Sequence, residues 1–170
     1  IGQGDSSVIN LGNHRAIVID VGPDAALEDA CLKALGVKEI PLLILTHFHA
    51  DHVEGLPGLL KRRSVGQVWV SNNTDPIFES ARVQSWLKGV PISVVTRGMQ
   101  STVSNVSIKV LWPLTTTQQF AMPHLLSQFS QRFLLAYPPK SKVTICKDGL
   151  PVIYPGRIDH LRTTPRRIRL

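Results

Sequence analysis

The stretch LTHFHADHVEGL, residues 45–56, places three of the chain's six histidines within six positions and adds an aspartate between them. It overlaps the end of IPLLILT, residues 40–46, a continuous apolar run. Such a run is typical of a β-strand that is buried on both faces. We therefore expect the histidine cluster to lie at the carboxyl end of a buried strand.

Four side chains of this stretch are candidate metal ligands: His47, His49, Asp51 and His52. In extended backbone, side chains two residues apart point to the same side, so His47 and His49 can reach one metal ion. Asp51 and His52 come where the chain turns toward a helix and can reach a second ion nearby. Imidazole and carboxylate together suit Zn²⁺, and also Mn²⁺ or iron. Two ions about 3.5–4 Å apart can activate a water and stabilise a phosphoryl or acyl oxygen.

The remaining histidines and the two cysteines form no comparable pattern. We expect His14, His124 and His160 to be ordinary surface or core residues. Cys31 and Cys146 are far apart in the sequence and belong to no CxxC motif. Neither a zinc finger nor a disulfide framework is therefore predicted, and we expect two buried or free thiols.

The formal net charge of +7 is concentrated in one part of the chain. Residues 1–110 carry ten Lys/Arg and ten Asp/Glu, whereas residues 111–170 carry nine and two. This asymmetry fits a functional basic tail or a terminus of different origin. No apolar run of about 18 residues is present, so no membrane span is predicted, and no signal peptide is visible. The chain begins at Ile1 inside a strand-like segment, so we expect it to be a piece of a longer protein.

Strand-like and helix-like segments alternate over the first 110 residues, which predicts an α/β layered domain. The expected strands are 6–11, 15–22, 40–46, 67–72, 91–96 and 106–112, and the expected helices are 24–36, 52–63 and 76–89. The first two strands are separated by a GNH turn and should form a hairpin. The pattern then stops, and the last sixty residues hold seven of the twelve prolines. We therefore expect a domain at residues 1–113 and a basic, proline-rich tail of uncertain structure at 114–170.

The segment THFHADH, residues 46–52, matches the HxHxDH signature of the metallo-β-lactamase fold. A second segment, AIVIDVGP, resembles the first motif of that family, a strand that ends in Asp and Gly. The resemblance implies an αββα sandwich of which only the N-terminal half is complete in this chain. It also implies that Asp20 lies beside the metal ligands and orients them. The alternative for Asp20 is a turn residue before Gly22-Pro23.

Further segments resemble the C-terminal domain of the ComEC family, bacterial membrane channels that take up DNA during competence. They are IGQGDSSVI, VIDVG, LTHFHADHVEGLPGLL, QVWVSN and VLWP. The resemblance implies two zinc ions, phosphodiester hydrolysis of DNA, and a role for Asp51 in holding a metal and orienting the attacking water. It also implies a full-length protein in the bacterial inner membrane with this domain on the extracytoplasmic side. Glu54 departs from the pattern, because many members carry Gly there.

The family's later ligands have no counterpart in the last sixty residues. Neither a Gly-Asp pair nor a His-His-Gly follows residue 113. We therefore expect impaired hydrolysis, and we hypothesise that the reading frame changes after Trp112. The alternatives are a hydrolase of a small substrate such as a lactam or thioester, a non-catalytic gene remnant, and a basic module that only binds nucleic acid. The sequence leaves the oligomeric state open.

Overall fold

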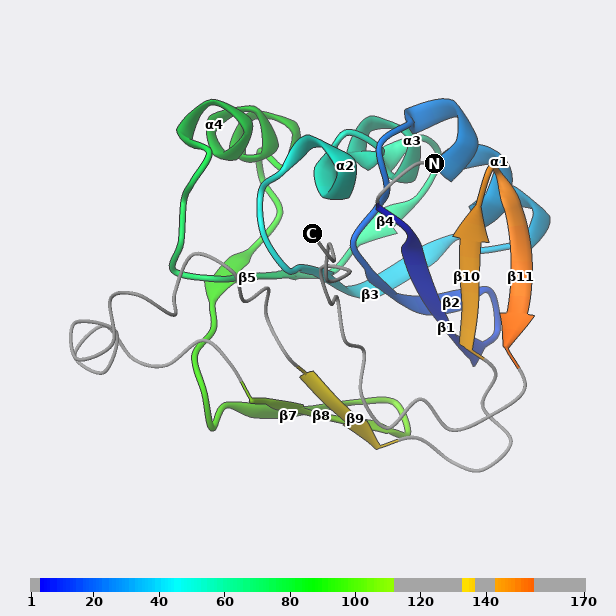
Figure 1. Cartoon of the computed structure of the whole chain (residues 1–170). Coiled ribbons are helices and arrows are strands. Elements are labelled where there is room, and N and C mark those ends of the chain that lie inside the picture. The colour runs from blue at the N-terminus through cyan, green and yellow to red at the C-terminus, as the bar shows by residue number, and fades with distance from the viewer. Residues whose placement is uncertain (1–3, 112–132, 137–142, 155–170) are drawn as a thin grey trace, which may run out of the picture.

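The computed structural model describes residues 4–111, 133–136 and 143–154. Helices cover one face of an eight-stranded sheet, and a three-stranded sheet lies on the other side of it (Figure 1). The predicted α/β class is thereby confirmed. In the described part of the chain, no helix is long and apolar enough to cross a membrane.

The large sheet is mixed, with strand order β11-β10-β1-β2-β3-β5-β6 and β4 paired to β3. The predicted hairpin is present as β1 (Ser6–Gly12) and β2 (Arg15–Ile19), which pair antiparallel. The strands on the other side of β2 run parallel to it and to one another. They are β3 (Glu39–Leu45), β4 (Ser64–Val65), β5 (Val68–Val70) and β6 (Ile92–Val94).

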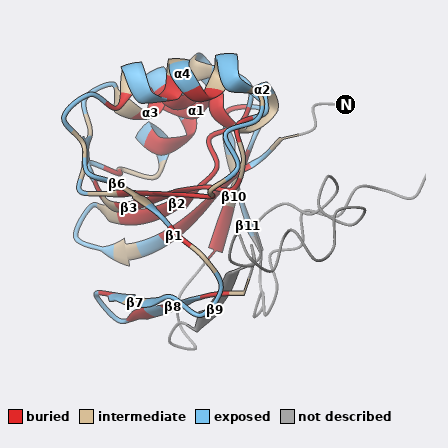
Figure 2. Cartoon of the chain, turned by 90° about the vertical axis from the view of Figure 1, so that its left-hand side faces the viewer, coloured by how far each residue is buried: buried red, intermediate tan, exposed pale blue. Residues whose placement is uncertain are grey.

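The central strand β3 is buried on both faces, which explains its continuous apolar sequence. Leu43 and Leu45 belong to the apolar core that includes residues of the helices. Leu42 and Ile44 belong to the core shared with the small sheet. All four side chains are fully buried, and Figure 2 shows buried residues along the large sheet between the outer layers. Because side chains alternate along a strand, a slip of one residue would exchange these two sets between the cores.

The helical layer consists of α1 (Ala25–Ala34), α2 (Ala50–Val53), α3 (Leu56–Leu60) and α4 (Ile77–Trp86). Helix α1 begins as predicted, because Asp24 Oδ1 accepts hydrogen bonds from Ala26 N at 2.7 Å and Leu27 N at 2.9 Å. The segment predicted as one interrupted helix forms two short ones, α2 and α3. Gly55, between α2 and α3, packs closely on the loop after β2. A Cβ added to Gly55 would lie 1.8 Å from Val21 O.

The small sheet contains β7 (Gln100–Val103), β8 (Val106–Val110) and β9 (Phe133–Ala136) in that order. Two more strands, β10 (Val143–Lys147) and β11 (Leu150–Tyr154), extend the large sheet from β1. Parts of the region expected to be a tail therefore belong to the fold. The strands in this region, β9, β10 and β11, have only four or five residues each, too few to give a clear sequence pattern. His124, His160 and the expected change of frame lie outside the described residues.

Cys31 and Cys146 form a disulfide, which corrects the expectation of two thiols. The two residues are 115 positions apart in sequence, and their Cα atoms are 5.8 Å apart. Cys31 lies on α1, and Cys146 lies on β10, which pairs with β1 beneath that helix. Their proximity follows from strand pairing across the whole chain, and sequence spacing carries no sign of it.

Replacing both cysteines, Cys31→Ser with Cys146→Ser, should lower the free energy of unfolding by about 2–4 kcal/mol. The cross-link closes a long loop and so reduces the conformational freedom of the unfolded chain. Urea denaturation of the wild-type chain with and without a thiol reductant provides the comparison. The double variant should be insensitive to the reductant. Equal stability of the oxidised and reduced wild-type chain would contradict the role given to the disulfide.

A second buried feature of α1 is the carboxyl group of Glu28, whose residue is only 3% exposed. Burial raises the pKa of Glu28 from its ordinary value of 4.5 to about 8, against the hydrogen bond from Ser6 and the charge of Arg63. The folded chain therefore holds a proton here that the unfolded chain releases. Stability from this group is complete below pH 4.5 and is lost as the pH rises toward 8.

Glu28→Gln should remove this loss, because the amide keeps a hydrogen-bonding group and cannot ionise. Between pH 5 and pH 9, the wild-type chain should lose on the order of 4 kcal/mol more than the variant. Chemical denaturation across that pH range measures the difference. Glu79→Gln, at a partly exposed position of α4, is the matched control and should keep the wild-type pH dependence. Parallel stability curves for Glu28→Gln and wild type would refute the assignment.

Candidate metal centre

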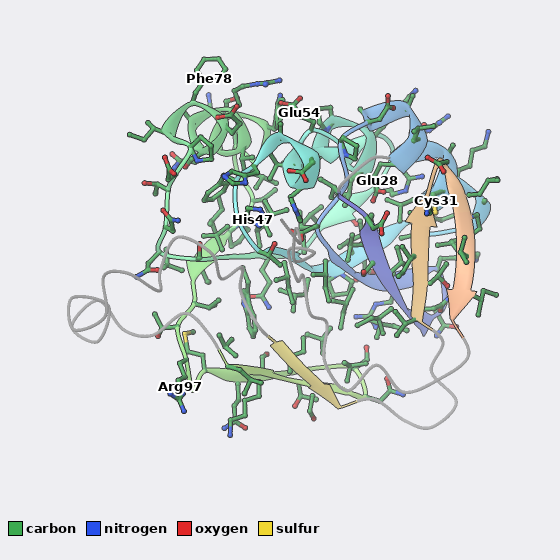
Figure 3. The ribbon with its side chains drawn as sticks, in the orientation of Figure 1. Glu28, Cys31, His47, Glu54, Phe78 and Arg97 are labelled. Atoms are coloured by element: carbon green, nitrogen blue, oxygen red, sulfur yellow. A yellow bond between two sulfur atoms is a disulfide. The ribbon has the colours of Figure 1, made fainter. Side chains whose placement is uncertain are left out.

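The histidine cluster lies at the carboxyl end of β3, as predicted. His47 and His49 follow the strand in an extended loop, and α2 begins at Ala50. Figure 3 shows His47 in this loop between the strand and the helix. Asp51 and His52 lie in the single turn of α2.

Three of the four candidate ligands converge. The ligand atoms of His47, Asp51 and His52 all lie within 4.8 Å of one another. His52 Nε2 is 3.6 Å from Asp51 Oδ2. His49 is outside this group, and its ring meets the His47 ring edge-on with centroids 4.8 Å apart. The structure thus groups His47 with Asp51 and His52, where the sequence had paired His47 with His49.

Asp20 lies beside this group and accepts hydrogen bonds from one of its members, His52, and from Thr46. Its side chain is buried, and Oδ1 accepts a hydrogen bond from Thr46 N at 2.8 Å. Oδ2 accepts one from Thr46 Oγ1 at 2.7 Å and another from His52 Nδ1 at 2.8 Å. The sequence placed Asp20 beside the site by resemblance but did not single out Thr46. The sign of Thr46 that the sequence offers is a hydroxyl side chain directly before the first histidine of the cluster.

These contacts determine which ring nitrogens can bind a metal. Thr46 gives its one hydroxyl proton to Asp20, so its 2.9 Å contact with His47 Nδ1 requires a proton on that nitrogen. His52 likewise needs its Nδ1 proton to bond Asp20. Both neutral imidazoles therefore keep their Nε2 lone pair free. A hydrogen bond from Nδ1 in this way orients a histidine so that its Nε2 can bind a metal.

The pKa values of the two converging histidines, His47 and His52, shift in opposite directions. Burial, followed by the charge of His52, lowers the pKa of His47 to about 4. Burial also acts to lower the pKa of His52, but the hydrogen bond to Asp20 and the nearby carboxylates outweigh it, and that pKa is raised. His47 is therefore neutral at physiological pH and available as a ligand.

Close backbone contacts hold the segments that carry these residues. Asp20 has a φ of 54°, a left-handed conformation that is unusual for a residue with a side chain. Val21 N donates to His52 O at 2.9 Å, which joins the loop after β2 to α2. Gly4 packs against the same helix, since an added Cβ would lie 1.8 Å from Asp51 O. Gly4 is thus a site-supporting residue that the sequence did not indicate.

Glu54, the position that departs from the family pattern, links α2 to α4. Its carboxylate oxygens Oε1 and Oε2 accept hydrogen bonds from Arg82 Nη1 at 2.5 Å and Nη2 at 3.1 Å. The guanidinium of Arg82 also lies over the Trp86 ring, 4.8 Å from its centroid. The extra charge of Glu54 is therefore neutralised by Arg82 and does not act freely on the metal centre.

A family model described as the Metallo-beta-lactamase superfamily matches residues 1–146. The chain belongs to this superfamily. Members generally bind zinc, and the group of His47, Asp51 and His52 fits such an ion in the kind and number of its ligand atoms. The match also extends past residue 113, in line with the pairing of β10 with β1.

The chain is similar over short stretches to proteins named Ribonuclease Z. It is 46% identical over 48 residues to that of Clostridium kluyveri, which covers 27% of this chain and 15% of the relative. It is 36% identical over 63 residues to that of Clostridium beijerinckii, which covers 37% of this chain and 18% of the relative. The matched stretches thus span less than a fifth of these relatives.

Solved structures of the superfamily share the fold. A subclass B3 metallo-beta-lactamase isolated from a soil metagenome library aligns with a TM-score of 0.52 at 17% identity, covering 84% of this chain and 56% of that one. The Rm3 metallo-beta-lactamase aligns with a TM-score of 0.52 at 20% identity, covering 84% and 55%. At these identities the likeness concerns the fold alone.

Asp20→Ala should lower the free energy of unfolding of the metal-free chain by about 2–4 kcal/mol. The change removes the buried acceptor of three donors: the amide and hydroxyl of Thr46 and Nδ1 of His52. Thermal and urea denaturation in the presence of a chelator measure the loss. Asp75→Ala, at an exposed loop position, should cost less than about 0.5 kcal/mol. A loss of that small size in Asp20→Ala would rule out the central role of this carboxylate.

Proposed function

We propose that this chain carries the metal-binding half of a metal-dependent hydrolase that cleaves phosphodiester bonds of nucleic acid. The observation that carries the proposal is the convergence of His47, Asp51 and His52, with both histidine tautomers set by Asp20 and Thr46. Three ligands that leave a further position open are typical of catalytic zinc sites, whereas structural sites are closed by four.

Each residue has a defined task in this proposal. His47 and His52 bind the ion through Nε2, and Asp51 binds it through a carboxylate oxygen. When bound, the ion supplies Lewis acidity, which acidifies a water and polarises a phosphoryl oxygen. The Asp51 side chain is 35% exposed, so its other oxygen can accept a hydrogen bond from the attacking water and orient it. Asp20 is too buried to meet substrate and acts by holding His52 and Thr46.

Nucleic acid is the favoured substrate class on two grounds. The opening strand and the motif order resemble the ComEC family, which favours DNA. The partial similarity to proteins named Ribonuclease Z supports a nucleic acid more generally and makes RNA the second candidate. We take DNA as the substrate and treat cleavage of RNA as an alternative outcome of the same assay.

We further propose that the full-length protein is a membrane-bound DNA-uptake protein with this domain on the extracytoplasmic side. The disulfide between Cys31 and Cys146 supports this location, because disulfides persist in oxidising compartments and are rare in the cytosol. A domain kept reduced in its native compartment would contradict the assignment.

Zinc binding by this chain should be weak, with a dissociation constant above about 1 μM, because the family's later ligand motifs have no counterpart in the sequence after residue 113. His47→Ala and His52→Ala should each abolish measurable binding in calorimetry, as should His47→Ala combined with His49→Ala. His49→Ala alone should keep most of the affinity, since His49 lies outside the converging group. His14→Ala, remote from the site, is the matched control. A loss in His49→Ala as large as in His47→Ala would support the original pairing of those two residues.

Hydrolysis by residues 1–170 should be low, and whatever activity occurs should require added zinc or manganese. The assay compares single-stranded DNA, RNA and nitrocefin under identical metal concentrations. Slow cleavage of DNA, absent in His47→Ala with His49→Ala, is the expected result. Preferential cleavage of RNA would redirect the substrate, and nitrocefin turnover alone would replace the proposal with a small-substrate hydrolase. Robust nuclease activity lost in the double variant would mean that residues after 113 supply further ligands.

A further inference from the structure

A cavity of about 310 Å³ lies beside the disulfide, and none of the three converging side chains His47, Asp51 and His52 lines it. Four segments line it: residues 4–6 at the start of β1, residues 21–24 after β2, residues 27–28 of α1, and residues 146–149 at the β10–β11 turn. Its volume is at the lower end of the range for small-molecule sites. None of the steps of the proposed hydrolysis uses this space.

The cavity wall contains a buried carboxyl group, and one of its oxygens has no hydrogen-bond partner among the described residues. Ser6 Oγ donates to Glu28 Oε1 at 3.0 Å, and no described residue donates to the other oxygen. Figure 3 shows Glu28 near the start of β1, close to Cys31. Arg63 influences Glu28 only through space, because its guanidinium is bound to Asp29 Oδ1 at 2.8 Å and to backbone carbonyls. Glu28 is therefore a buried hydrogen-bonding group that a ligand in the cavity can complete.

The rim of the cavity is predominantly acidic. Asp5, Asp24 and Asp148 carry carboxylates there, and Lys147 is the one cation among the described lining residues. Asp24 is already engaged as the cap of α1 through Oδ1. A single metal ion does not fit this arrangement, because within the described ranges only His47, Asp51 and His52 bring three ligand atoms together. The charge pattern instead matches an elongated cation.

The wall between Glu28 and the rim is apolar. Val21, Pro23, Leu27 and Cys146 contribute to it. Gly149, at the β10–β11 turn, has a φ of 76°, and an added Cβ there would meet Leu27 Cδ2 at 3.1 Å. A side chain at this position would be strained and would crowd the apolar wall. A chain of methylene groups is the complement of such a surface.

We propose that this cavity binds a short aliphatic diammonium ion, with one ammonium on Glu28 and the other on the rim carboxylates of Asp5 and Asp148. The methylene chain then lies along the apolar wall. Because Glu28 is protonated in the free protein, binding proceeds with release of its proton: the carboxyl O–H ionises, the proton enters solvent, and the carboxylate accepts a hydrogen bond from the ammonium. The attraction between the two charges, together with the hydrogen bonds from Ser6 and from the ammonium, offsets the cost of removing water from both charges.

Isothermal titration calorimetry of the full chain with 1,4-diaminobutane tests the proposal. EDTA in the buffer keeps metal ions out of the measurement. We expect saturable one-to-one binding, with close to one proton released at pH 7 as judged from two buffers of different ionisation enthalpy. Affinity should rise about tenfold between pH 6 and pH 7, because the ionised fraction of Glu28 rises by that factor. Butylamine, which carries a single charge, should bind at least tenfold more weakly.

Glu28→Gln should reduce the affinity at least tenfold and abolish both the proton release and the pH dependence. Glu79→Gln is the matched carboxyl-to-amide control and should bind as wild type does. Asp148→Asn, at the exposed turn, should weaken binding several-fold and provides the test if Glu28→Gln fails to fold. The proposal is overturned if the wild-type chain shows no saturable heat. It is also overturned if Glu28→Gln, or Asp148→Asn in its place, binds with unchanged affinity.

Discussion

The hydrogen bonds of the buried Asp20 carboxylate are the interactions on which the candidate metal centre depends. This carboxylate accepts hydrogen bonds from the amide and hydroxyl of Thr46 and from the ring of His52. Through Thr46 it also determines the tautomer of His47. One side chain therefore positions two histidines that come from a loop and a helix. A buried anion without these donors would be costly, so the network is stable only when all its members are present.

The sheet brings Asp20 to that place. Asp20 directly follows β2, and Thr46 directly follows β3. These strands are parallel, and Ile19 pairs with Ile44 at the end next to the site. Their carboxyl ends meet at one edge, where ligands of open α/β sheets are commonly held. Because β3 is apolar on both faces, the hydrogen bonds from the Thr46 amide and hydroxyl to Asp20 distinguish the correct register at this edge. A slip of one residue would move Thr46 away from Asp20 and also exchange the two core faces of the strand.

The other end of the chain supports the same arrangement from the side. Strand β10 pairs with β1, and its Cys146 is cross-linked to α1. Gly4, just before β1, packs against the backbone of Asp51. Strand β10, more than a hundred residues after α1 in the sequence, thus helps to hold β1 in place. The segment just before β1 is the one that contacts the candidate metal centre. The cavity beside Glu28 lies in the space between these same elements.

The sequence by itself determined the main elements of the first 110 residues and the location of the candidate site. The hairpin at β1 and β2, the capped helix α1 and the doubly buried β3 follow from local patterns of apolar residues, turns and caps. The HxHxDH spacing located the candidate ligands because it reflects the geometry of a strand leading into a helix. Only the tertiary structure decided which ligands converge, and it brought His47 to Asp51 and His52 while leaving His49 aside. The disulfide, the role of Thr46 and the pairing of β10 with β1 likewise depend on contacts between segments distant in sequence. Local patterns carry no information on such contacts, because they arise only when strands pair and layers pack.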